Sequence, residues 1–234
     1  MKSKIKQLYK NINNRYPFIG ALILKIYYWQ VIRTISKSIY GDNNIVSYKN
    51  AILSSVSFDI RGSDNHIEIS EGCILNNVKF YIRGNKHKVL INKNCKFNQG
   101  GSIWFEDSGC QLIIGEGSTF ENVHLALTEP NSQIDIGDDC MFAYDIDIRT
   151  GDSHSIISQA SNERINYAKN IFIGNHVWIA AHSILLKGTF ISDNSVVATG
   201  SVLTKQYKTS GVIIGGNPSR VLKEEINWTR ERIY

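Results

Sequence analysis

The sequence predicts an all-β chain wound as a parallel β-helix, and two repeats together with an excess of β-branched residues support this. From Ile173 the chain reads as successive hexads, and each of the six begins with Ile, Leu or Val, at positions 173, 179, 185, 191, 197 and 203. The fifth position of the first five hexads is Val, Ser or Thr. A coil with three flat sides explains this register, because each aliphatic side chain points inward and a small residue fits beside the corner. An α-helix of 3.6 residues per turn cannot hold a six-residue register.

A longer repeat precedes the hexads and extends the same coil toward the N-terminus. Isoleucines recur at steps of 22, 23 and 22 residues, at positions 69, 91, 114 and 136. Positions 60, 82 and 105 open similar segments. Four residues after each of the recurring isoleucines comes a small residue: Cys73, Cys95, Ser118 and Cys140. We expect these cysteines to be stacked, buried small residues, since free Cys is often used in that way, and not disulfide or metal ligands.

These repeats divide the chain into three parts. Residues 45–207 are predicted to form one continuous β-helix, interrupted by a projecting loop at 152–170 where the repeat breaks. Residues 208–234 are predicted to be a C-terminal tail that caps the stack, since an open solenoid end must be covered. Residues 1–44 form a basic N-terminal segment in which 16–40 read as an amphipathic helix. That helix could pack over one end of the domain, or it could lie on an anionic membrane surface.

The charge distribution argues against a nucleic-acid-binding protein. Residues 1–41 hold eight Lys or Arg and no acidic residue, so the rest of the chain carries 18 basic and 21 acidic residues. The basic character therefore belongs to the N-terminal segment and not to a groove in the fold. The sequence shows neither a convincing signal peptide nor an apolar stretch that could span a bilayer. We expect a cytoplasmic protein with reduced cysteines that makes peripheral contact, if any, with the inner face of the membrane through residues 1–40.

Three motifs carry a resemblance to a known family. They are IRTGDSHSI at 148–156, IFIGNHVWIAAHSILLKG at 171–188, and the stretch from SVLTK to GGNPSRVLK at 201–223. In this order they resemble the hexapeptide-repeat O-acetyltransferases that modify galactosides, maltose and capsular polysaccharides. ERINYAKNIFIGNHVW and the ending EEINWTRERIY resemble the polysialic-acid capsule O-acetyltransferases in particular. The resemblance implies a left-handed β-helix, a homotrimer with active sites between subunits, and transfer of acetyl from acetyl-CoA to a sugar hydroxyl.

The family's catalytic base falls on His154 by this resemblance. A sugar hydroxyl is a poor nucleophile until it loses its proton, and an imidazole that titrates near neutrality suits that task. Asp152 is the first candidate to orient the imidazole, although Asp145, Asp147 or a backbone carbonyl could do so equally well. The turn from Trp178 to Ala181 is the expected source of amide donors for the oxyanion.

The resemblance also implies binding residues for both substrates. Trp178, Asp145 and Arg149 are expected to contact the acceptor, although Trp178 could instead be a packed corner aromatic residue. Acetyl-CoA is expected to contact Ala180, Ala181, Thr199, Thr204, Lys205, Arg220 and Lys223, with the basic residues near its phosphates. Ala180 stands where the family usually has Gly, and Thr204 stands where the polysialic-acid enzymes carry a tyrosine, which leaves the acceptor open. A cis bond at Asn217–Pro218 is possible.

Other readings of the same residues remain. His154, His176 and His182 could suggest the three-His zinc site of the β-helical carbonic anhydrases, but the spacing differs, and we expect no metal. His66, His87 and His124 have no motif and are expected to be structural or exposed. A second enzymatic hypothesis is an acetyltransferase for a small acceptor such as a nucleotide-sugar amine, serine or a drug. A non-catalytic β-helix used as a binding module is the third, since a fold does not prove a function.

Overall fold

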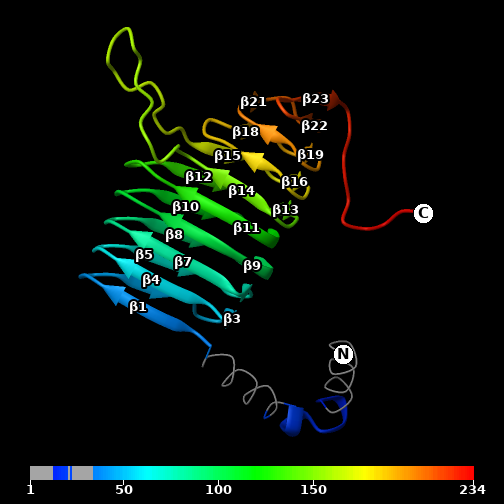
Figure 1. The fold of residues 1–234 in the computed structure, drawn as a ribbon. Helices are drawn as coiled ribbons and strands as arrows, with labels where there is room; N and C mark the ends of the chain where they lie inside the picture. The colour runs from blue at the N-terminus through cyan, green and yellow to red at the C-terminus, as the bar shows by residue number, and fades with distance from the viewer. Residues whose placement is uncertain (1–12, 21, 23–33) are drawn as a thin grey trace.

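The computed structural model describes residues 13–20, 22 and 34–234, and residues 34–223 wind into a parallel β-helix with three faces (Figure 1). About half of the amphipathic helix predicted at 16–40 falls outside the described residues. Residues 13–15 and 17–20 are helical, but Ser36–Tyr40 is a strand, β1. Among the described residues no helix is long and apolar enough to cross a membrane.

The first face is a ladder of short parallel strands in which each coil stacks on the one before. It contains β3 (Ile52–Ser54), β6 (Ile74–Asn76), the start of β9 (Lys96–Phe105), the start of β11 (Thr119–Leu127), β13 (Met141–Phe142), β16 (Trp178–Ile179), β19 (Val196–Val197) and β22 (Ile213–Gly216). Strands β9 and β11 continue around the corner, so each contributes to the second face as well.

The second face holds the longer strands and becomes the important one for function. After β1 it contains β4 (Ser57–Arg61), β7 (Val78–Arg83), the ends of β9 and β11, β14 (Ile146–Arg149), β17 (Ile184–Leu185) and β20 (Val202–Leu203). Its strands alternate between buried and half-exposed side chains, which is the pattern of a sheet with one face in the core and one in water.

The third face completes each coil. It contains β2 (Ile45–Ser47), β5 (His66–Ile69), β8 (Lys88–Ile91), β10 (Gln111–Ile114), β12 (Gln133–Ile136), β15 (Ile171–Ile173), β18 (Phe190–Ile191) and β21 (Gln206–Tyr207). Its register pairs Ile69 with Ile91, Ile91 with Ile114, and Ile114 with Ile136. The recurring isoleucines of the sequence therefore mark single coils.

The β-helix extends past both of its predicted ends. Strand β1 pairs in parallel with β4 and aligns Ile39 with Ile60, so the inward apolar position already exists before residue 45. At the other end β22 stacks on β19 beyond residue 207. It then turns back into β23 (Ser219–Lys223), an antiparallel partner, around the cis peptide bond Asn217–Pro218. Both extensions cover ladder edges that would otherwise be exposed.

The core is a stack of side chains, one from each coil. Phe97, Phe120 and Phe142 overlap with ring centroids 4.4 and 4.6 Å apart. Burial raises the pKa of the Cys140 thiol to about 12. The predicted role of the cysteines as buried small residues is confirmed, since all four cysteines of the chain are buried free thiols. The slot predicted from the repeat, in which every member is at most 1% exposed, holds Cys73, Cys95, Ser118 and Cys140.

Two segments leave the coil. The loop after β14 projects from the corner between the second and third faces, where Figure 1 shows it standing clear of the stack. Ile157 and Arg164 form an isolated antiparallel bridge within it, so the loop resembles a hairpin. After β23 the C-terminal segment runs back down the outside of the coil, beside the first face, as a strap (residues 224–234).

Candidate active site

His154 lies near the start of the projecting loop, shortly after β14 ends at Arg149. Its side chain is exposed, and its backbone N–H donates to the carbonyl of Asp152 at 2.7 Å. Among the described residues the imidazole has no hydrogen-bond partner of its own. Both ring nitrogens are therefore left open to a bound group.

Asn166 ties the two sides of the loop base together. It is 7% exposed, and its amide nitrogen donates to the carbonyl of His154 at 2.7 Å and to the carboxylate of Asp152 at 2.9 Å. Its amide oxygen accepts from the backbone N–H of Ile156 at 2.7 Å and from Arg164 at 3.1 Å. The carbonyl of His154 and the backbone N–H of Ile156 are thus both held by the side chain of Asn166.

The carboxylate of Asp152 is engaged by this loop base and not by the imidazole. It forms an ion pair with Lys187, which also donates to the carbonyl of Asn166 at 3.0 Å. Burial raises the pKa of Asp152, but the hydrogen bonds from Lys187 and Asn166 outweigh burial and leave the pKa below its ordinary value. The two other carboxylates predicted as alternative partners of the imidazole are also bonded elsewhere, Asp145 to His182 and Asp147 to Arg149.

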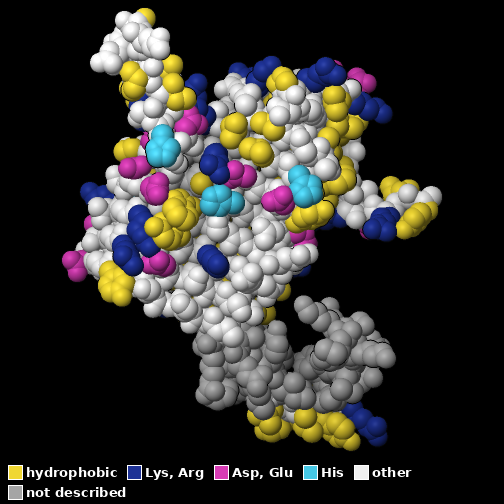
Figure 2. Space-filling model, viewed as in Figure 1, with side chains coloured by type: hydrophobic (Ala, Val, Ile, Leu, Met, Phe, Trp, Pro, Cys, Tyr) yellow, Lys and Arg dark blue, Asp and Glu magenta, His cyan; other side chains and the backbone are white. Residues whose placement is uncertain are grey.

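A cleft of about 420 Å³ opens on the second face beside His154. Figure 2 shows histidine, acidic and basic side chains gathered on this face below the loop. The predicted pair of His154 and Arg149 is brought together here. The residues that line the cleft are Trp104, Glu106, His124, Ala126, Thr128, Arg149, Ser153 and His154.

Sequence reasoning missed His124 and Trp104 in this cleft. His124 Nδ1 bonds the hydroxyl of Ser102, and its ring meets the Trp104 indole edge-on at 6.5 Å. Burial lowers the pKa of His124, which favours the neutral ring. The sequence did contain one relevant pattern. Trp104, Ala126 and Arg149 follow one another at the spacing of the coil and therefore share a row. That spacing alone does not show which side chains of the row leave room for a cleft.

Other predicted residues lie at a different corner, between the first and second faces. Asp145 Oδ2 lies 2.7 Å from His182 Nδ1 there, beside the turn formed by Ala180 and Ala181. The backbone N–H of Ala180 donates to the carbonyl of the stacked Val197 at 2.9 Å, whereas that of Ala181 has no partner among the described residues. This corner is therefore separate from the cleft that contains the candidate base.

Trp178 belongs to the first face and not to the cleft. It is half-buried, with its ring 6.0 Å from that of Trp228. One chain therefore does not place Trp178, Asp145 or Ala181 in the cleft with His154.

The residues predicted to bind acetyl-CoA also do not all lie at one place. Lys205 and Arg220 share a second cleft, of about 520 Å³, whose wall includes the cis bond at Pro218. Thr204 directly precedes Lys205 and is exposed, whereas Thr199 is exposed in the turn between β19 and β20. Lys223 ends β23 and lies outside the lining of this cleft. The arrangement gathers two cations at one place where a phosphate could bind.

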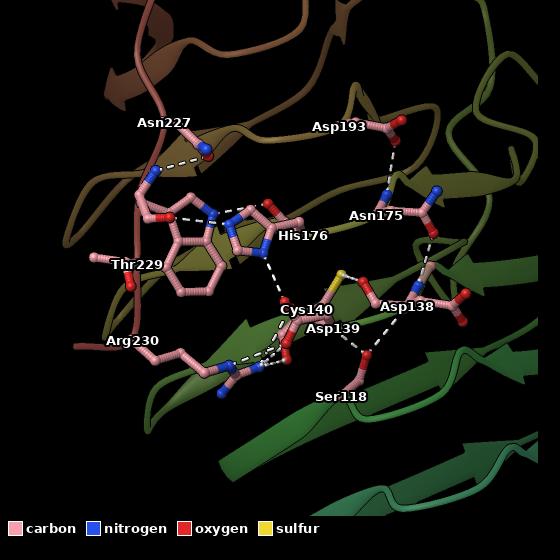
Figure 3. A network of polar contacts seen from close by, with 12 residues as sticks. Ser118, Asp138, Asp139, Cys140, Asn175, His176, Asp193, Asn227, Thr229 and Arg230 are labelled. Carbon is pink, nitrogen blue, oxygen red and sulfur yellow. Dashed lines mark hydrogen bonds and ion pairs between the residues drawn. The ribbon is translucent and has the colours of Figure 1, made fainter.

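The strap is fixed to the first face by a network that sequence reasoning did not predict (Figure 3). Trp228 stacks on His176 with centroids 4.2 Å apart, and its indole N–H donates to the carbonyl of His176 at 2.7 Å. Arg230 reaches Asp139 and donates to the carbonyl of Cys140 at 3.0 Å. His176 Nδ1 also lies 2.7 Å from the carboxylate of Asp139, so this histidine serves to hold the strap.

The three histidines of the zinc hypothesis lie apart within one chain. His154 is in the projecting loop, His182 is at the corner beside Asp145, and His176 is under the strap. Within the described part of the chain no group of three or more His, Cys, Asp or Glu residues is placed to hold a metal ion.

No family model matches the chain, but individual proteins do. It is 34% identical over 127 residues to a polysialic acid O-acetyltransferase of Neisseria meningitidis, covering 54% of this chain and 59% of that protein. It is 32% identical over 122 residues to a polysialic acid O-acetyltransferase of Escherichia coli O1:K1 / APEC, covering 52% and 39%. A galactoside O-acetyltransferase of Escherichia coli (strain K12) is 32% identical over 117 residues, covering 50% and 55%. Each match spans less than two thirds of the relative's length.

Two solved structures resemble the fold over most of its length. The polysialic-acid-specific acetyltransferase NeuO superimposes with a TM-score of 0.74 at 28% identity, covering 84% of this chain and 83% of that one. The polysialic acid O-acetyltransferase OatWY gives 0.73 at 27% identity, covering 84% and 93%. The left-handed β-helix predicted by resemblance is confirmed, and so is the resemblance itself: the chain has the fold and the sequence features of the hexapeptide-repeat O-acetyltransferases.

Proposed function

We propose that this protein transfers an acetyl group from acetyl-CoA to a hydroxyl of a sugar in a capsular or other surface polysaccharide. The observation that carries the proposal is His154, an imidazole without a hydrogen-bond partner among the described residues, held by its backbone at the edge of a polar cleft. The same residue is the family's catalytic base by resemblance. The polysialic acid O-acetyltransferases that share the fold support an acidic glycan as the acceptor.

The chemistry is a direct transfer. His154 takes the proton of the sugar hydroxyl as its oxygen attacks the thioester carbonyl, and the new C–O bond gives a tetrahedral oxyanion. Collapse breaks the C–S bond, and the imidazolium returns the proton to the departing sulfur, so the products are the acetyl ester and free CoA. No acyl-enzyme is needed, which agrees with four cysteines buried in the core. Asp152 acts indirectly, by fixing the loop through Asn166 and Lys187.

A second copy of the chain completes the site in this proposal. Trp178, Asp145 and Ala181 lie at a different corner from His154, so a neighbouring subunit must supply them if they serve the same reaction. The backbone N–H of Ala181 then provides an oxyanion donor. The cleft that holds Lys205 suits the phosphates of acetyl-CoA. A homotrimer of the kind implied by the resemblance meets these requirements.

The proposed location is the cytoplasm, where acetyl-CoA is made. The cationic residues 1–41 would attract the enzyme to anionic lipid at the inner face of the membrane, close to a glycan under synthesis.

The test is release of free thiol from acetyl-CoA, measured against a panel of acidic and neutral capsular oligosaccharides. We expect wild-type turnover to depend on the acceptor and His154→Ala to lower kcat at least about 100-fold, as expected for loss of a general base. His66→Ala is the matched control, because His66 is an exposed histidine on the third face. Equal kcat values for the two variants would remove His154 from the reaction, and silence with every acceptor would contradict the proposed function.

A further inference from the structure

One outward-facing row of the second face runs straight along the β-helix. Neighbouring strands lie about 4.8 Å apart, so Trp104 and Arg149, two coils apart, are separated by about 10 Å at the backbone. The intervening residue, Ala126, has only a methyl group. The strand registers align six successive positions of this row, one from each coil: Ser38, Asp59, Tyr81, Trp104, Ala126 and Arg149.

The middle of this row is a fixed aromatic stack. The rings of Tyr81 and Trp104 lie 3.8 Å apart between centroids, at an angle of 21°. The guanidinium of Arg83 lies 3.7 Å from the Tyr81 ring centre and is held by Asp59 at 2.7 Å. Stacking on one side leaves the indole of Trp104 with its other side toward Ala126. A side chain held in this way loses little conformational freedom when a ligand binds.

The space above Ala126 is the cleft that contains His154. Ala126 is 7% exposed and forms part of the cleft lining between Trp104 and Arg149. Glu106, His124 and Arg149, also in the lining, are half-exposed polar side chains. The cleft therefore combines one aromatic surface with groups able to bond hydroxyls, which suits a sugar ring.

We propose that this slot is an acceptor subsite that holds one pyranose ring of the saccharide between Trp104 and Arg149. The C–H face of the ring packs on the indole, and its hydroxyls bond His124, Glu106 or Arg149. This inference rests on the proposed function and extends it, because a ring anchored here is a neighbour of the sugar that presents its hydroxyl to His154. The enzyme then prefers an oligomer to a single sugar.

The subsite is tested by two substitutions, one that fills the slot and one that removes its aromatic surface. Ala126→Leu places a larger side chain in the slot, and Trp104→Ala removes the aromatic surface. With short and long oligomers of sialic acid as acceptors, we expect both variants to raise KM at least about tenfold for the long oligomers and to change kcat less than about twofold. The control is Ser38→Leu, the same kind of enlargement on the same row but three coils below Trp104. Melting temperatures identify any variant that fails to fold.

Binding is measured separately from transfer, so that the two proposals can fail independently. Titration calorimetry of the His154→Ala protein with the same oligomers, and with maltose oligomers as neutral pyranose chains, reports the subsite alone. Loss of binding in Ala126→Leu and Trp104→Ala, but not in Ser38→Leu, supports the subsite even if no acetyl transfer is found. Binding constants and KM values unchanged in both folded variants would overturn it while leaving the proposed transfer reaction intact. A His154→Ala protein that binds none of these saccharides would overturn it as well.

Discussion

The side-chain amide of Asn166 donates to the backbone carbonyl of His154, 12 residues earlier, at a distance of 2.7 Å. The same nitrogen donates to the carboxylate of Asp152 at 2.9 Å. A loop that protrudes from a β-helix has few core contacts to fix its shape, so this one buried amide does much to position the candidate base. It does so without touching the imidazole.

Asn166→Ala should therefore impair the reaction more than the fold. We expect kcat to fall about tenfold to 100-fold, because a base displaced by about 1 Å transfers protons poorly. The lost hydrogen bonds should cost about 1–3 kcal/mol of unfolding free energy. The measurement is thiol release together with urea unfolding. Asn166→Asp is the matched variant, since it keeps an acceptor for Ile156 and loses the donor; activity retained in Asn166→Asp would show that the donated bonds to His154 and Asp152 are dispensable.

His87 should make the fold sensitive to acid. Its Nδ1 accepts from the backbone N–H of Cys110 at 3.2 Å and its Nε2 lies 3.1 Å from the carbonyl of Arg83, which fixes a neutral ring. Burial lowers the pKa of His87 from its ordinary value of 6.5. Below pH 6.5 the unfolded chain takes up a proton that the folded chain refuses, so stability falls as the pH drops toward the lowered pKa.

The measurement is the unfolding free energy between about pH 7.5 and pH 5 for wild type and His87→Gln. We expect the fall with decreasing pH to be smaller in the variant, which has no group to titrate at that position. His66→Gln is the control, because His66 is exposed. An identical pH dependence in wild type and His87→Gln would show that another group causes the loss of stability in acid.

The phenylalanine stack should dominate the stability of the middle coils. Phe120 is fully buried between Phe97 and Phe142. Phe120→Ala should lower the unfolding free energy by about 3–5 kcal/mol, because the rigid coils on either side cannot collapse into the space. Phe172→Ala is the comparison, since Phe172 is 37% exposed on the third face. Chemical denaturation measures the unfolding free energy of both variants. Similar losses of unfolding free energy would mean that the stack is not the source of the stability.

The repeats predicted the fold well because each position in a β-helix repeats the same environment. Ile69 and its successors fixed the coil length, and the cysteine slot followed from it. The cleft could not be predicted in the same way. It depends on Ala126 being small between two large residues of other coils, and a single small residue in a strand has no distinctive pattern.

The repeat also could not predict where the coil ends or which residues hold the base of the loop. Strand β1 has only one inward aliphatic residue aligned with the next coil, Ile39, which is too little for a repeat to be detected. Asn166 acts through bonds within a segment that follows no periodicity. His154 was predicted because a motif resemblance marked it, and its backbone contacts became visible only in three dimensions.

The strap offers a last test, because residues 208–234 were predicted as a tail that caps the stack, whereas their last part, the strap, runs along the side. Trp228 is 9% exposed, and its indole joins the strap to His176 by stacking and by a hydrogen bond of 2.7 Å, while its backbone carbonyl lies 3.0 Å from His176 Nε2. Trp228→Ala should free residues 224–234 while leaving the coils folded, since the core lies on the other side of the strands. We expect faster proteolytic cleavage within this segment and a melting temperature close to that of wild type.

Ile233→Ala is the control for that experiment, because Ile233 is 84% exposed. A Trp228→Ala protein whose strap is cut no faster than that of the control would show that the indole is dispensable. The contacts of Arg230 with Asp139 and the carbonyl of Cys140, and of His176 with the backbone carbonyl of residue 228, would then hold the segment. A large fall in melting temperature would instead show that the strap is part of the cooperative fold, because freeing it would then expose the first face from β11 to β16. The two results therefore distinguish a clamp on the surface from a structural edge of the β-helix.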